Sequence, residues 1–195
     1  MLQAKLKAGR VECGTDEAGR GCLAGPVTAA AIILPEDFQH PLLNDSKSLT
    51  ERQRLIIEPI LKEEAISYAV VHIDNNKIDK INILQASVLA MHRAIDQLDL
   101  KPEFIAVDGN YFKEYPKIAH KCVVKGDARL LHIAAASILA KNARDRVMAD
   151  LDKDYPAYGW KTNKGYPTKA HREAIAKMGP SPYHRISFKL LPDSN

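Results

Sequence analysis

Apolar residues along this chain follow two kinds of spacing. Five short runs rich in Val, Ile and Ala have the length and composition of buried strands. Four longer segments repeat apolar residues every three to four positions, as helices do. The expected strands are 11–16, 27–34, 66–73, 104–108 and 118–124, and the expected helices are 51–64, roughly 82–98, 130–151 and 168–178.

The order of these elements predicts an α/β chain with a mixed sheet. The gap between the first two strands is too short for a crossover helix, so they should form an antiparallel hairpin. Later strands are separated by helices and can run parallel. Thr50 and Gln53 have the spacing of a capping box at the start of the first helix. Pro59 lies inside that helix and should kink it or restart it.

Composition limits the class of protein. A length of 195 residues suits one domain with a short extension, and 46% hydrophobic residues provide enough material for a core. Cys13, Cys22 and Cys122 form no CxxC pair and leave an odd count, which favours a reducing compartment over a disulfide framework. No signal peptide or apolar membrane span is evident, so we expect a cytoplasmic protein without membrane contact.

Positive charge is concentrated in the C-terminal part. Residues 120–195 contain 14 Lys/Arg and 7 Asp/Glu, whereas the remaining residues contain 14 and 17. Residues 160–189 contain seven Lys/Arg against one acid, Glu173. This asymmetry suggests a polyanion partner, although a solvated basic surface would give the same count.

Acidic residues stand at two predicted strand ends. Asp16 closes the first strand and Asp108 closes the fourth, while Glu17 and Asp127 follow a strand end closely. Crowded carboxylates repel one another, and a hard cation such as Mg²⁺ or Mn²⁺ would relieve that repulsion. Each acid alone would be an ordinary turn or cap residue. Because neighbouring strand residues point to opposite faces, Asp16 and Asp108 are the firmer ligands, and Glu17 needs a strand break or another angle.

Two polar loops offer weaker candidates. Ser46 and Lys47, in "NDSKSL", would hold a phosphate near a helix N-terminus or would simply form a turn. Tyr166, in "NKGYPT", would stack on a sugar or base or would lie in a surface turn set by Gly165 and Pro167. His132, in an apolar helix, is a core histidine in our interpretation and not a ligand.

Six spaced motifs together resemble bacterial ribonuclease HII, a type 2 ribonuclease H. They are "TDEAGRGCLAGPV", "DSKSL", "VDGN", "KGDA", "AAASILAKNARDR" and "NKGYPTKAH", in the family's order, and the resemblance extends over about residues 12–188. It implies a ribonuclease H-like fold with a five-stranded mixed sheet flanked by helices. Residues 1–195 would form one catalytic domain, with a small basic helical extension at about 155–195.

The resemblance also implies an activity. The expected enzyme is an endonuclease that hydrolyses the RNA strand of RNA–DNA hybrids and incises 5′ to ribonucleotides embedded in duplex DNA. Hydrolysis would use two divalent cations, Mg²⁺ or Mn²⁺, and would leave 3′-hydroxyl and 5′-phosphate ends. By motif, Asp16, Glu17 and Asp108 would be catalytic metal ligands. Asp127 would be the fourth acid, with Asp145 of "ARDR" as its rival.

The resemblance also implies which residues contact the substrate. The turn Gly19-Arg20-Gly21 resembles the element that recognises the ribose 2′-hydroxyl through its backbone, and Tyr166 resembles the residue that stacks on the neighbouring sugar. Cys22 stands where many members have proline, which puts the tightness of the turn in question. The protein is expected to be a monomer, and contact with a replication clamp is left open. Two alternatives remain: the sister enzyme ribonuclease HIII and a catalytically silent hybrid-binding protein.

Overall fold

The sheet contains five strands in the order β3-β2-β1-β4-β5. The computed structural model describes residues 2–43 and 49–192, so Ser46 and Lys47 lie outside the described residues. The strands are β1 (Glu12–Ala18), β2 (Val27–Ile33), β3 (Ser67–Ile73), β4 (Phe104–Asp108) and β5 (Ala119–Val123). β2 runs antiparallel to both β1 and β3, whereas β1, β4 and β5 are mutually parallel. The predicted hairpin and mixed sheet are confirmed.

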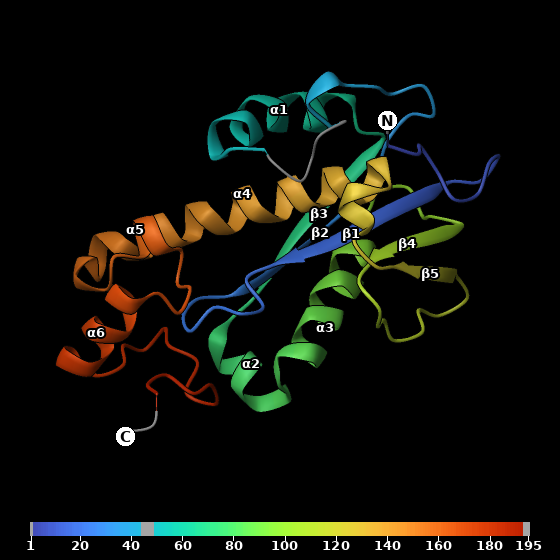
Figure 1. Ribbon diagram of the computed structural model, residues 1–195. Helices are drawn as coiled ribbons and strands as arrows, with labels where there is room; N and C mark the ends of the chain where they lie inside the picture. Colours follow the sequence, from blue (N-terminus) through green and yellow to red (C-terminus); the bar gives the residue numbers. More distant parts are fainter. Residues whose placement is uncertain (1, 44–48, 193–195) are drawn as a thin grey trace.

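Helices cover both faces of this sheet (Figure 1). They are α1 (Glu51–Glu64), α2 (Asn75–Ile81), α3 (Ile83–Asp96), α4 (Leu131–Asp154), α5 (Trp160–Asn163) and α6 (Lys169–Met178), with 3₁₀ turns at Gly126–Ala128 and Pro156–Tyr158. α1 and α4 lie on one side of the sheet and α3 on the other, while α5 and α6 gather beyond one end. Among the described residues, none of the helices is long and apolar enough to cross a membrane.

Local signals set most helix boundaries. The capping box of Thr50 and Gln53 is formed as predicted. A restart at Pro59 is wrong, because α1 is continuous through it. Proline leaves the carbonyl of Leu55, inside α1, without its helical partner. Leu55 is half exposed, so water can reach this part of the helix. The sequence reading also missed α2, which ends where Asn82 adopts φ +65° and caps α3.

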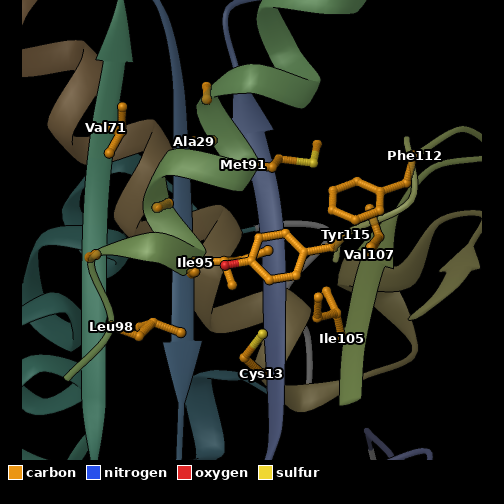
Figure 2. Packing of buried hydrophobic residues seen from close by; sticks show 14 of the residues in the cluster. Cys13, Ala29, Val71, Met91, Ile95, Leu98, Ile105, Val107, Phe112 and Tyr115 are labelled. Atoms are coloured by element: carbon orange, nitrogen blue, oxygen red, sulfur yellow. The ribbon is translucent and has the colours of Figure 1, made fainter. Parts of the chain in front are cut away.

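Two apolar clusters stabilise the two faces of the sheet. Figure 2 shows the cluster on the α3 side, where Cys13, Ile105 and Val107 of the parallel strands meet Met91 and Ile95 of the helix. The opposite cluster joins β2 to α1 and α4 and consists mainly of Ala, Ile and Leu side chains. These buried surfaces provide the main driving force for folding, at about 25 cal/mol per Å² of apolar surface.

Small residues bring α4 unusually close to β1. A Cβ at Gly14 would lie 2.3 Å from the main-chain carbon of His132. His132 is buried there, and its Nδ1 is 2.9 Å from the carbonyl oxygen of Glu12, in keeping with the core assignment. This contact fixes α4 against the strand that carries Asp16.

The C-terminal part has an apolar cluster of its own. Its buried members come from the segment after β1, from α4 and from the C-terminal helices: Leu23, Ala24, Met148, Tyr158, Trp160 and Ile175. The basic residues of this part do not all face solvent. Arg185 is fully buried, and the side chain of Lys164 is largely covered beside Glu51. Charge counting therefore overstates the basic surface available to a polyanion.

Candidate active site

Asp16 and Asp108 occupy adjacent positions on neighbouring parallel strands. The register of β1 and β4 pairs Thr15 with Val107, and the two acids are the next residues on each strand. Gly14 and Ala106, two residues earlier on each strand, pack toward α4. Strand alternation therefore directs both acids to the α4 face of the sheet.

These two carboxyl groups perturb each other. Burial raises the pKa of Asp16 well above its usual value, and repulsion from Asp108 and Glu17 adds to the rise. Burial also raises the pKa of Asp108, opposed by hydrogen bonds from the main-chain N–H groups of Gly126, at 2.7 Å, and Asp127, at 3.4 Å. A bound cation would relieve the repulsion between these crowded carboxylates and favour their ionised form.

Glu17 joins this group from the other side of its strand. β1 runs without a break through Ala18, so the strand break that we considered is absent. Oε1 of Glu17 accepts a hydrogen bond from Arg20 at 3.1 Å, whereas Oε2 is buried and has no hydrogen-bond partner among the described residues. Burial raises the pKa of Glu17, and repulsion from Asp108 contributes. An unpaired buried carboxylate oxygen is a group that a cation would satisfy.

The two rivals for the fourth acid lie in different surroundings. Asp127 is in the 3₁₀ turn after β5, and its charge helps to raise the pKa of Asp108. Asp145 lies on α4, where its Oδ2 is 2.8 Å from Nη2 of Arg54. Asp127 thus acts on Asp108 through both its main-chain N–H and its charge, whereas the carboxylate of Asp145 is paired with Arg54.

The turn Gly19-Arg20-Gly21 follows β1 directly. Gly19 is buried with φ +90°, and a Cβ there would lie 2.0 Å from Nε of Arg144. Arg20 and Gly21 are exposed, and a Cβ on Gly21 would have no neighbour within 4 Å. Gly21 does not have a positive φ. The first glycine is therefore required by the fold, whereas open space surrounds the second.

Tyr166 lies beside this turn although 145 positions separate it from Gly21 in the sequence. The main-chain N–H of Leu23 donates to the carbonyl of Gly165 at 2.8 Å, which holds the two loops together. Tyr166 is 47% exposed, and its hydroxyl contacts the thiol of Cys22. Cys22 itself is fully buried, and burial raises the pKa of its thiol. Half-exposed tyrosine beside exposed backbone is suited to nucleic-acid contact.

Sequence reasoning missed two residues on α4. Ser137 and Lys141 both act on Asp16, the hydroxyl and the ammonium group each opposing the rise of its pKa. Lys141 acts on Asp108 in the same way. Their spacing of four places them on one helix face, which is the signal that would have identified them in "AAASILAKN".

The carboxylates are grouped without forming a complete metal cage. Among residues 2–43 and 49–192, no three His, Cys, Asp or Glu side chains converge closely enough to hold a metal ion by themselves. Mg²⁺ is commonly held by one or two carboxylates together with water and substrate phosphate. The oxygen donors and the orphaned Oε2 of Glu17 fit that kind of site.

The five-stranded mixed sheet with helices on both faces is the ribonuclease H-like fold. The family model described as Ribonuclease HII matches residues 13–191. A curated ribonuclease HII of Parabacteroides distasonis is 58% identical over 193 residues, which cover 99% of this chain and 97% of that protein. The chain belongs to the ribonuclease HII family. It is an endoribonuclease of the hydrolase class, and the family acts on RNA–DNA hybrids with a divalent metal.

Solved structures agree with this assignment. Ribonuclease H2 of Pyrococcus horikoshii OT3 superposes with a TM-score of 0.74 and 26% identity, over 92% of this chain and 94% of that one. A structure described as Bst-RNase HIII in complex with Mn²⁺ shares the fold, with a TM-score of 0.70 and 19% identity. The match covers 67% of that chain. The family match therefore favours ribonuclease HII over the sister enzyme.

Proposed function

We propose that this enzyme incises duplex DNA 5′ to an embedded ribonucleotide, in addition to cleaving RNA–DNA hybrids. The observation that supports this proposal is the order in which the acids and the turn follow one another at the end of β1. Buried Asp16 lies beside Asp108, and the exposed Arg20–Gly21 backbone follows within five residues. A reactive phosphate at the acids would place the adjoining ribose within reach of that backbone.

We assign the acids to cation binding. Asp16 and Asp108 would be the principal ligands, with Glu17 and Asp127 completing the set and Lys141 balancing charge when no cation is bound. Two divalent cations held there would activate a water molecule for in-line attack and stabilise the departing 3′ oxygen. The protein would orient the phosphodiester and exclude other water, and the products would carry 3′-hydroxyl and 5′-phosphate ends.

We assign ribose recognition to the turn and Tyr166. DNA lacks the 2′-hydroxyl, so a backbone N–H or carbonyl directed at that group distinguishes the two sugars. Gly21 allows close approach, because no side chain stands between its backbone and solvent. Tyr166 would stack on the neighbouring sugar, and lysines of the C-terminal part would hold phosphates with salt-sensitive affinity.

The test is a cleavage assay on three matched duplexes with Mg²⁺, Mn²⁺ or a chelator. One duplex contains a single ribonucleotide, one is an RNA–DNA hybrid, and one is all DNA. We expect metal-dependent incision 5′ to the single ribonucleotide, cleavage of the hybrid, and an intact all-DNA duplex. Incision on the 3′ side, or cleavage of the hybrid alone, would contradict the proposed specificity.

A further inference from the structure

Arg185 connects the C-terminal segment to the turn after β1. Its guanidinium is fully buried and donates to three main-chain carbonyls. Nη1 lies 3.0 Å from the oxygen of Arg20, Nε 3.0 Å from that of Gly25, and Nη2 3.0 Å from that of Pro26. The planar guanidinium group of Arg185 therefore fixes both ends of the segment 20–26.

Burying this cation is costly, and the fold compensates with carbonyl dipoles. Burial and the neighbouring Arg144 lower the pKa of Arg185 to about 10, so it remains charged at neutral pH. Arg144 is buried too and donates to the carbonyls of Ala24, Pro26 and Lys164. Two adjacent buried cations are tolerated only while these carbonyls stay in place, which constrains the backbone conformation of 20–26.

Peptide geometry transmits this constraint to Gly21. The peptide bond between Arg20 and Gly21 is trans, as are all those in the described residues. In a trans peptide the C=O and the following N–H point in opposite directions. Because Arg185 draws the Arg20 carbonyl inward, the N–H of Gly21 must point outward, where Gly21 is exposed.

The main chain of Arg185 is fixed as firmly as its side chain. Its N–H donates to Leu23 at 2.8 Å, and the N–H of Gly25 donates to Tyr183 at 2.9 Å, on either side of a bridge between Ala24 and His184. Beyond it, Asp79 accepts hydrogen bonds from the N–H groups of Ile186 and Ser187, both at 3.0 Å. Arg185 thus extends from an anchored segment.

We propose that Arg185 is a positioning residue that aims the Gly21 N–H at the substrate 2′-hydroxyl. This makes the C-terminal segment part of ribose recognition, although it lies 164 positions from Gly21 in the sequence. The inference rests on the proposed function of the turn. It assigns Arg185 no contact with substrate, because its guanidinium is enclosed by protein.

The test measures sugar preference as a ratio of two dissociation constants. An Asp16→Asn background prevents cleavage, and binding is measured to an all-DNA duplex and to the same duplex with one ribonucleotide. We expect Arg185→Lys, which keeps the charge and loses the planar guanidinium group, to lower this ratio about tenfold, as expected for one lost hydrogen bond. Affinity for all-DNA duplex should stay within about twofold.

Asp79→Asn provides the matched control, because it loosens the same segment at Ile186 and Ser187 without touching the turn. It should leave the ratio unchanged. The inference would be overturned if the ratio of dissociation constants in Arg185→Lys equalled that of the parent protein. It would also be overturned if the ratio fell equally in Arg185→Lys and Asp79→Asn. A parent protein without preference for the ribonucleotide duplex would overturn the proposed function and this inference with it.

A measurement on the unsubstituted turn does not depend on how well Arg185→Lys folds. The ¹⁵N–¹H resonance of Gly21 in the Asp16→Asn protein should shift when the ribonucleotide duplex is added, more than with the all-DNA duplex. The Gly19 resonance, from a buried residue of the same turn, is the internal control. Equal shifts of Gly21 with both duplexes would overturn the inference.

Discussion

The acid end of the sheet and the turn that follows it lie side by side but depend on different parts of the chain. Asp16 and Asp108 are aligned by strand register, and Asp108 is oriented by main-chain groups of the nearby 3₁₀ turn. The turn at 19–21 packs against Arg144 at Gly19, accepts a hydrogen bond from Arg185 at Arg20 and borders the Tyr166 loop. In our proposal, the chemistry therefore depends on the sheet and sugar recognition on the C-terminal part.

The sharpest test of this division is loss of a central acid. Asp16→Asn and Asp108→Asn should each reduce Mg²⁺-dependent cleavage by about a thousandfold or more. Binding to hybrid duplex should persist, and thermal unfolding should occur at the same or a higher temperature, because a buried repulsion is removed. Turnover near that of the parent in either variant would remove that acid from the site.

A second comparison concerns the disputed acid. Asp127→Asn should lower cleavage about a hundredfold, because its charge lies against Asp108. Asp145→Asn should cost less than about tenfold, since its carboxylate is paired with Arg54. Rates on the single-ribonucleotide duplex at saturating Mg²⁺ decide the ranking. The reverse order would make Asp145 the fourth ligand.

Acid should loosen the C-terminal part. Burial and the neighbouring His171 lower the pKa of His184 to about 4, so folding favours its neutral ring. The resulting stability is complete above about pH 6.5 and is lost as the pH falls toward 4, with a loss of about 2 kcal/mol between pH 7 and pH 5. Unfolding free energies in denaturant at several pH values measure this slope.

His184→Gln should reduce that slope. The buried His132, whose pKa is also lowered to about 4, is a matched histidine on α4, outside the C-terminal part. Trp160, the single tryptophan, donates to His171 at 2.9 Å and reports on the C-terminal part by fluorescence. A change of its emission with acid that is the same in parent and His184→Gln would contradict the assignment to His184.

The smallest expected effect separates the two glycines of the turn. Gly21→Ala should leave stability unchanged and lower cleavage at a single ribonucleotide about tenfold, because its Cβ meets only the approaching substrate. The backbone of Gly21 does not itself require glycine, since its φ is not positive. Unfolding and cleavage measured together distinguish steric from conformational effects.

Gly19→Ala is the contrasting variant. It should lower stability by about 2 kcal/mol, because φ is +90° and Arg144 occupies the space of the Cβ. Full cleavage activity and full ribonucleotide preference in Gly21→Ala would show that backbone readout by this turn is wrong.

Much of the protein was determined by local sequence. Alternating and continuous apolar runs predicted all five strands, because burial on a pleated sheet imposes that pattern. The capping box predicted the start of α1. The sequence placed Asp16 and Asp108 at the ends of two strands, and the two acids do lie side by side, although β1 continues past Asp16 to Ala18.

Only the tertiary structure decided the rest. Charge counting assigned Arg185 to a basic surface, yet it is buried beneath the turn, because its hydrogen-bond partners come from 159 to 165 positions away. Our preference for Asp127 over Asp145 likewise rests on tertiary contacts, because the charge of Asp127 acts on Asp108 whereas Asp145 pairs with Arg54. Such contacts have no local pattern, because they are set by how the C-terminal segment and α4 pack against the sheet.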